Sequence, residues 1–178
     1  MQYVGFWGRF GAYWIDVLVL SPLAIAAIWL SPYKYYYVAI GLPGFALGLV
    51  YHVYLVQRFG GTPGKLVLKQ RIVKVSGEPV GYREALLRYV VLMVLSLGSS
   101  LGIALGALQI PDSDYAALSS LAQRAVALQQ AAPGWYQIIN VATQVWVWSE
   151  FVVLLTNRKR RALHDFMAGT VVIKREPA

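Results

Sequence analysis

Four apolar stretches dominate this chain, and each is long enough to cross a lipid bilayer. A spanning helix needs about 20 mainly apolar residues, because each residue rises about 1.5 Å across a hydrocarbon core roughly 30 Å thick. A chain of 178 residues is also too short to surround four such helices with polar protein. The sequence therefore predicts an all-α transmembrane fold, a four-helix membrane bundle. Its spans are residues 10–30, 36–56, 89–110 and 135–155.

Positive charges are sorted to one side of these spans. Of the 16 Lys and Arg residues, all but Lys34 and Arg124 lie in the N-terminal segment, in residues 57–88 or in residues 156–178. Short loops rich in Lys and Arg stay on the cytoplasmic side of a membrane. We therefore expect a single multi-pass domain of the cell membrane. Both termini and residues 57–88 would be cytoplasmic, and residues 111–134 would form an outer loop.

The basic composition indicates a lipid partner rather than a nucleic acid. The net charge is +8, but the basic residues flank apolar spans and so lie near anionic headgroups. The chain has no cysteine, which excludes disulfides and thiolate chemistry. No nucleotide-binding or hydrolase motif occurs, and the two histidines lie far apart in the sequence. We expect no enzyme activity, no cofactor and no metal site.

The polar segments contain their own secondary structure. Segments near residues 70–75 and 170–175 are β-branched, and a lone strand is not stable, so we expect them to pair as a small cytosolic antiparallel sheet. In the outer loop, Leu118, Leu121, Ala125 and Leu128 recur at helical spacing. They predict a short amphipathic helix, with capping candidates at residues 112–114. A mobile polar loop is the alternative.

Asp16 is the clearest ionisable residue inside a predicted span, where charges are costly and mark functional sites. Arg9 lies seven residues earlier, nearly two helical turns, so both side chains project from one face. Their axial separation of about 10 Å is too large for a direct bond. Asp16 is either a carboxylate that exchanges a proton or cation, or a polar anchor that fixes the first helix.

Two further residues in or near the spans carry weaker signals. Glu150 shares a face of the fourth span with Asn140 and Thr143, which indicates either interhelical hydrogen bonds or the lining of a water-filled path. His52 lies near the cytoplasmic end of the second span. It is either a hydrogen-bonding residue or, since its charge changes near neutral pH, a proton relay.

The tail around His164 and Asp165 predicts a short amphipathic helix that stops at Gly169. Asp165 would then pair with a nearby arginine such as Arg9. Side chains on adjacent helical positions point in different directions, which argues against a catalytic pair of His164 and Asp165.

Three separated motifs stand out: Arg9 with Asp16 in the first helix, the Thr62-Pro63-Gly64-Lys65 turn with its following strand, and the tail from Arg161 to Thr170. Together they resemble the RDD family of small bacterial and archaeal membrane proteins. The family is named for one arginine and two aspartates, and the resemblance places these at Arg9, Asp16 and Asp165. It implies a membrane protein of unknown function for which transport of an unidentified ligand has been suggested.

Two functions follow as hypotheses. The first is transport of an ion or small solute coupled to protons, with Asp16 binding the proton or cation and Arg9 tuning its charge. Because four spans rarely enclose a full transport path, this hypothesis requires a dimer or larger homo-oligomer. The second is a non-transporting adaptor or scaffold. Its basic cytosolic sheet would dock a cytosolic protein, while Arg9, Asp16 and Asp165 order the helix ends.

Overall fold

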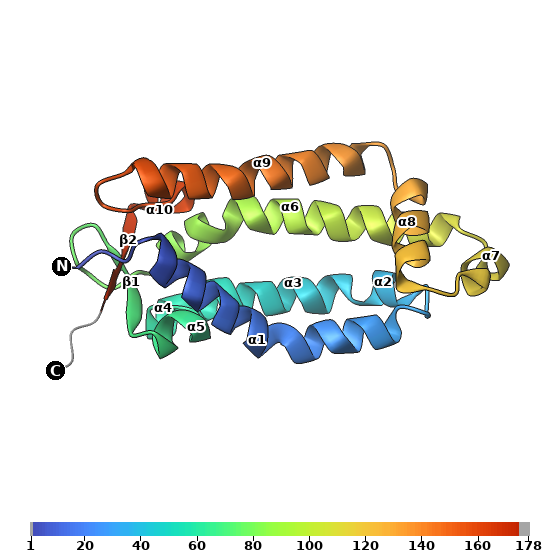
Figure 1. The fold of residues 1–178 in the computed structure, drawn as a ribbon, viewed down its shortest axis with the longest axis horizontal. Coiled ribbons are helices and arrows are strands. Elements are labelled where there is room, and N and C mark those ends of the chain that lie inside the picture. Colours follow the sequence, from blue (N-terminus) through green and yellow to red (C-terminus); the bar gives the residue numbers. More distant parts are fainter. Residues whose placement is uncertain (1, 175–178) are drawn as a thin grey trace. The chain divides into compact units, whose positions relative to one another are not determined.

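The computed structural model describes residues 2–174, which form ten α-helices, a π-helical turn and two strands. Figure 1 shows the long helices and the small sheet. Three spans are single helices: α1 (Phe6–Leu30), α6 (Tyr82–Gln109) and α9 (Trp135–Thr156). Together with the segment Tyr36–Val67 they are long and apolar enough to cross a membrane. The predicted helical membrane fold is confirmed.

The second span is a series of short helical segments rather than one regular helix. They are α2 (Tyr36–Ala39), α3 (Gly41–Leu49), a π-helical turn at Val50–Tyr54, α4 (Leu55–Phe59) and α5 (Pro63–Val67). Gly60, in the left-handed region at φ 82°, ends α4 and lets the chain turn. Single π-helical turns within helices are frequent at functional sites.

Two helices begin before the apolar stretch on which the prediction rested. The first helix was expected from residue 10 and begins at Phe6, and the third was expected from residue 89 and begins at Tyr82. The added residues of α6, 82–88, include three charged side chains, and Glu84 among them accepts a hydrogen bond from the Gly81 N–H at 2.8 Å. Hydropathy finds the apolar part of a span, whereas helix capping sets where the helix begins.

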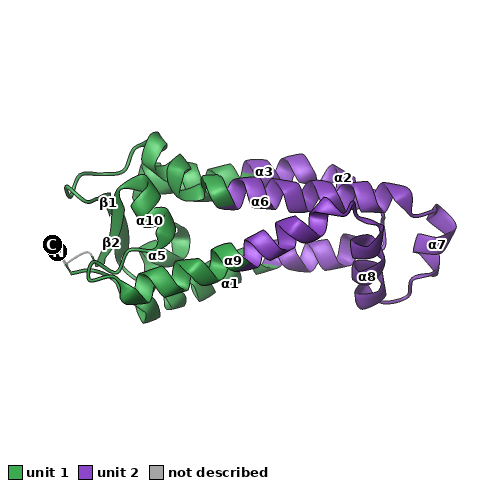
Figure 2. Ribbon diagram, turned by 90° about the horizontal axis from the view of Figure 1, so that it is seen from above, with its two compact units in different colours: residues 1–21, 47–91, 145–178 green, residues 22–46, 92–144 purple. Residues whose placement is uncertain are grey.

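Contacts divide the chain into two compact units, which Figure 2 colours separately. The first comprises residues 1–21, 47–91 and 145–178, and the second comprises residues 22–46 and 92–144. The division falls at Pro22 within α1, a residue that cannot donate to the Leu18 carbonyl. The Ser21 hydroxyl donates to that carbonyl instead, at 2.8 Å.

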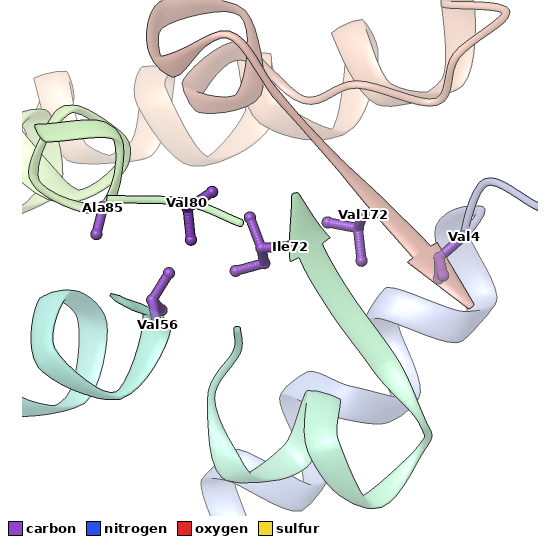
Figure 3. Packing of buried hydrophobic residues seen from close by; sticks show 6 residues of the cluster. All are labelled: Val4, Val56, Ile72, Val80, Ala85 and Val172. Atoms are coloured by element: carbon purple, nitrogen blue, oxygen red, sulfur yellow. The ribbon is translucent and has the colours of Figure 1, made fainter. Parts of the chain in front are cut away.

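The predicted sheet is present in the first unit. Strand β1 (Gln70–Lys74) pairs antiparallel with β2 (Thr170–Lys174), with Ile72 opposite Val172. Val4 N–H donates to the Val172 carbonyl at 2.9 Å, so the N-terminal segment lies along β2. The apolar side chains of these segments pack with residues from α4 and the start of α6, as Figure 3 shows. This core consists of Val4, Val56, Ile72, Val80, Ala85 and Val172.

The predicted outer helix is present in the second unit, but it begins later and is capped differently. Two helices form there, α7 (Asp112–Ala117) and α8 (Leu121–Ala131), and Leu118 lies in extended backbone between them. The expected caps at residues 112–114 do not begin α8. Ser120 caps it by accepting the Gln123 N–H at 3.2 Å, and the Gln123 side chain bonds back to the Ser120 N–H.

A buried tyrosine anchors these outer segments within the second unit. Tyr115 of α7 packs with Ala107 and Leu128, and its hydroxyl donates to the Ser31 carbonyl at 2.6 Å. Lys34 is buried as well, donates to the Ile110 carbonyl and forms an ion pair with Asp112. The hydrogen bond from Lys34 lowers the pKa of Asp112. These contacts make residues 111–131 an ordered structure rather than a mobile loop.

Candidate functional site

Asp16 lies on α1 and is almost fully buried, with 9% of its surface exposed. Three groups donate hydrogen bonds to its carboxylate, each at 2.6 Å: the Tyr51 hydroxyl, the Thr62 hydroxyl and the Gly64 backbone N–H. All three donors are neutral. Among the described residues, no lysine, arginine or histidine forms an ion pair with Asp16. Neutral dipoles therefore bind the carboxylate directly, and the ammonium of Lys65 connects to it only through the Thr62 hydroxyl.

The Thr62-Pro63-Gly64-Lys65 turn supplies two of the three hydrogen-bond donors to this carboxylate. Thr62 has the extended backbone of an N-cap and Pro63 opens α5, where its missing N–H costs nothing. The Thr62 hydroxyl does not cap its own helix but donates to Asp16, which in turn accepts the Gly64 N–H. Asp16 thus caps α5 from a neighbouring helix, and the two segments are held together.

Gly64 is required here by space. A Cβ on Gly64 would lie 2.9 Å from Asp16 Oδ1 and would also collide with the Ala12 carbonyl, a backbone atom that cannot move aside. Gly64→Ala is therefore expected to lower the free energy of unfolding by about 1–3 kcal/mol, as overpacking does. Unfolding in detergent measures this effect.

The matched control for Gly64→Ala is Gly44→Ala. A Cβ on Gly44 meets no atom within 4 Å. Because alanine loses less backbone entropy than glycine in a helix, this change should be neutral or stabilising by up to about 1 kcal/mol. Equal losses in the two variants would show that Asp16 and Gly64 are not in close contact.

The π-helical turn carries both Tyr51 and His52. Tyr51 is buried and reaches Asp16, whereas the His52 ring stacks on the Tyr89 ring with centroids 4.7 Å apart. His52 makes no side-chain hydrogen bond to another described residue, so its expected hydrogen-bonding role is replaced by packing. Lys65 donates to the Thr62 hydroxyl at 3.4 Å, which places one ammonium group next to the residues that solvate Asp16.

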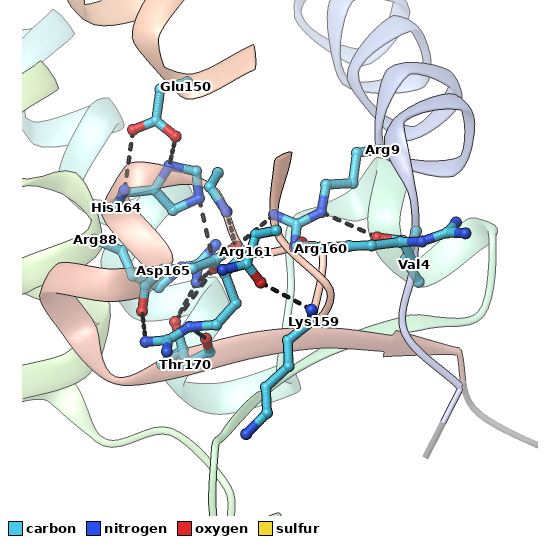
Figure 4. Close-up of polar contacts among 12 residues, drawn as sticks. Val4, Arg9, Arg88, Glu150, Lys159, Arg160, Arg161, His164, Asp165 and Thr170 are labelled. Carbon is cyan, nitrogen blue, oxygen red and sulfur yellow. Dashed lines mark hydrogen bonds and ion pairs between the residues drawn. The ribbon is translucent and has the colours of Figure 1, made fainter. Parts of the chain in front are cut away.

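Asp165 forms a second, separate cluster, drawn in Figure 4. Its side chain is fully buried and pairs with Arg9, at 2.6 Å, and with Arg88. The Thr170 hydroxyl and the Ala162 N–H also donate to it, at 3.3 and 3.0 Å. Burial alone would raise the pKa of Asp165, but Arg88, His164 and Arg9 outweigh burial and hold it below the usual range. The cluster thus favours the ionised form of Asp165.

The same cluster joins several segments that are distant in the sequence. Arg9 from α1 also donates to the Arg160 carbonyl at 2.6 Å. Arg161 donates to the backbone carbonyls of Asp165 and Thr170, at 3.0 and 3.1 Å. The cluster therefore ties the start of α1, the start of α6, α10 (Leu163–Ala168) and β2 together. As expected, α10 stops at Gly169, which has φ 65°.

His164 lies between two carboxylates. Its Nδ1 is 2.7 Å from Glu150 Oε2, and its Nε2 is 3.7 Å from Asp165 Oδ1. The prediction that His164 and Asp165 point apart is therefore too simple, since the imidazole ring reaches back towards its neighbour. The His164 backbone N–H also donates to Glu150 at 3.1 Å. Burial, together with the charge of Arg88, lowers the pKa of His164 against the opposing effects of Asp165 and Glu150.

The pKa shifts of His164 and Asp165 make stability depend on pH. Folding lowers both pKa values, so the unfolded state binds more protons and acid favours it. The contribution of His164 is lost as pH falls below about 6.5, and that of Asp165 only below about 3.9. We expect the midpoint of thermal unfolding to drop between about pH 7.5 and about pH 5.5.

His164→Gln is the control for this pH dependence, because an amide can donate to Glu150 but does not titrate. Its melting temperature should be flatter over the same pH range when both proteins are followed by circular dichroism. An identical pH dependence in the two proteins would assign the acid sensitivity to another group.

The polar face of α9 does not form the expected interhelical bonds. The Thr143 hydroxyl donates to the Ile139 carbonyl of its own helix at 2.8 Å, a common solution for threonine in a helix. Only Glu150 from this face forms a polar side-chain contact with another described segment, the one with α10. The helical periodicity shows that Asn140, Thr143 and Glu150 share a face of α9, but it does not show which segment that face contacts.

The structure places the candidate residues in two clusters. As expected, Arg9 pairs with Asp165 and not with Asp16, and Glu150 and His164 join the Asp165 cluster. Sequence reasoning missed the donors Tyr51, Thr62 and Gly64 and the second arginine, Arg88. A signal exists for Arg88, which precedes the apolar part of α6, but membrane orientation alone also accounts for its charge.

Comparison with known proteins identifies a family for this chain. The model of the RDD family matches residues 3–169, nearly the whole chain. That range includes both buried aspartates and the turn that connects Asp16 to α5. A search of the curated proteins and a search of the solved structures each found no match. The extent of the family match is decisive, and the chain belongs to the RDD family of membrane proteins.

Proposed function

We propose that this protein transports a small cation or a proton-coupled solute, with Asp16 as the group that exchanges the proton or cation. The observation that carries the proposal is the surroundings of Asp16: a buried carboxylate inside a span, with three neutral donors and no ion pair to a described residue. Ionisable groups in such places line ion pathways and proton relays.

The contrast with Asp165 supports this assignment. Two arginines neutralise Asp165, so neither a proton nor a cation can compete for its oxygens without breaking two ion pairs. At Asp16, a bound proton or cation displaces hydrogen bonds from hydroxyl groups, which rotate freely to accept instead of donate. Arg9 holds the helix ends in this proposal and does not tune Asp16.

The segment that holds Tyr51 supports it further. A π-helical turn has one residue more than a regular turn, and small rearrangements between the two forms shift the side chains that it carries. The turn Val50–Tyr54 would let Tyr51 approach or leave Asp16. Four spanning helices rarely enclose a full transport path. The transporting form in this proposal is therefore a homo-oligomer, at least a dimer.

Flux in proteoliposomes tests the proposal. The native protein is reconstituted, gradients of sodium, potassium or pH are imposed, and internal pH is followed with a trapped dye. Cation-dependent proton movement above that of protein-free vesicles is the expected result. No flux in any gradient, from protein that melts cooperatively, would contradict transport of these ions.

The proposed location is the cell membrane with both termini in the cytoplasm, supported by the sorting of charge. The chain has no native cysteine, so single cysteines report its topology. Ser76 and Ser119 are both exposed in the structure. A thiol reagent that cannot cross membranes should label Ser119→Cys in intact cells and Ser76→Cys only after lysis. Labelling of Ser76→Cys in intact cells would reverse the orientation.

An adaptor function is the second candidate, and one observation favours it. The Asp165 cluster fixes the two-stranded sheet to the helix ends, and the sheet exposes the basic residues Arg71 and Lys174. A rigid basic sheet on a membrane anchor suits an acidic cytosolic partner. Absence of flux, together with salt-sensitive capture of a cytosolic protein that Arg71→Glu abolishes, would support this function over transport.

A further inference from the structure

A groove lies within the first unit, between the start of α1 and the end of α9. Its volume is about 670 Å³. One wall is apolar and consists of Phe6, Trp7, Leu154 and Leu155. The other is polar and consists of Asn157, Arg158 and Arg160. The apolar wall belongs to the spanning helices, and the polar wall follows directly after the last residue of α9, Thr156.

The arginines of this groove form no ion pair within the described part of the chain. None of the ion pairs among residues 2–174 includes Arg158, Arg160 or the lysine between them. Arg160 contributes its backbone carbonyl to the Asp165 cluster, while its side chain points away from Asp165 in Figure 4 and packs over Gly5. Its charge is available to a ligand.

The backbone that carries these arginines is nevertheless ordered. The Lys159 N–H donates to the Asn157 side chain at 2.8 Å, and the Arg160 N–H donates to the Asn157 carbonyl at 2.9 Å. Arg160 has φ 48°, and Arg9 holds its carbonyl at 2.6 Å. The turn from Asn157 to Arg160 is therefore already formed. A ligand that binds its two arginines does not pay the entropic cost of ordering this loop.

We propose that this groove binds one anionic phospholipid. The headgroup phosphate lies between Arg158 and Arg160, because guanidinium groups match phosphate oxygens in pairs. The acyl chain lies against Trp7 and Leu155, which are 78% and 68% exposed. Tryptophan is suited to the headgroup level, where one part of its ring is apolar and the other polar.

Binding of an anionic lipid in this groove differs from the general attraction of anionic lipids to a basic surface. Diffuse attraction depends on the number of charges, whereas the groove requires two specific arginines and an apolar wall next to them. A zwitterionic phosphatidylcholine should bind more weakly, because its choline cation meets the same two arginines. The proposal is independent of transport, since none of these residues contacts Asp16.

Native mass spectrometry of the detergent-solubilised full chain tests the proposal by counting bound lipids during titration with phosphatidylglycerol. The native protein should hold one phosphatidylglycerol more tightly than the rest. The double variant Arg158→Gln/Arg160→Gln should weaken this site by about 10- to 30-fold, as expected for the loss of two headgroup contacts. Trp7→Ala should weaken it as well, which a purely electrostatic site would not show.

The matched control is Arg58→Gln/Arg83→Gln, which removes the same charge from two exposed arginines outside the groove. It should weaken the site by less than about threefold, because only diffuse attraction is lost. Equal weakening by the two double variants would overturn the proposal. Displacement of the lipid by inorganic phosphate alone would also overturn it, since the groove would then be an anion site. Melting curves show that each variant is folded.

Discussion

Replacing Asp165 with asparagine is expected to lower the free energy of unfolding by about 3–5 kcal/mol, the largest effect on stability of any single substitution proposed for this chain. The side chain is fully buried between Arg9 and Arg88. An amide keeps the shape but removes the charge, so two largely buried guanidinium groups would remain without a counter-ion. Chemical unfolding in detergent, followed by circular dichroism, measures the loss.

Glu78→Gln is the control for this change. Glu78 is exposed and its ion pair with Lys74 spans 3.5 Å, so its removal should change stability by less than about 1 kcal/mol. If Asp165→Asn were as stable as Glu78→Gln, the cluster would not hold the helix ends and the sheet together.

Asp16→Asn is expected to abolish flux while the protein remains folded. The asparagine carbonyl can still accept from Tyr51 and Gly64, and its NH₂ group can donate to the Thr62 hydroxyl, which rotates to accept. We therefore expect a stability loss of only about 1–2 kcal/mol, because Asp16 has no direct ion-pair partner that the substitution would leave behind. An amide cannot take up or release a proton, so coupled transport should stop.

The control for Asp16→Asn is Asp114→Asn, an exposed carboxylate on α7. It should transport at the native rate per folded protein, measured as the initial rate of dye response. Native flux in Asp16→Asn would remove Asp16 from the mechanism, whatever the stability of the variant.

The fold was predictable from the sequence because its main signals are local. Apolar length identifies each span, and β-branched residues identify β1 and β2. The end of α10 at Gly169 follows from the freedom of glycine at positive φ. Capping was predicted less well, since the Ser120-x-x-Gln123 pattern was present but the acidic residues before it were preferred.

The two aspartate clusters could not be predicted in the same way, because they depend on contacts between distant residues. The pair of Arg9 with Asp165, 156 positions apart, is the exception, since the tail motif already suggests it, whereas the second arginine, Arg88, is found only from the structure. The Thr62-Pro63-Gly64 turn carries no sign that its donors face α1. Only the packing of α1 against α5 shows that Gly64 leaves room for the Asp16 carboxylate.

Infrared difference spectroscopy of the carboxyl groups tests most directly the claim that Asp16 exchanges its proton while Asp165 stays ionised. Native protein and Asp16→Asn are compared in deuterated detergent buffer as pH is cycled across the range in which flux occurs. The account predicts a protonated-carboxyl band that appears and disappears in the native protein and is absent from Asp16→Asn. The same band in both proteins, or none in the native protein while flux persists, would contradict it.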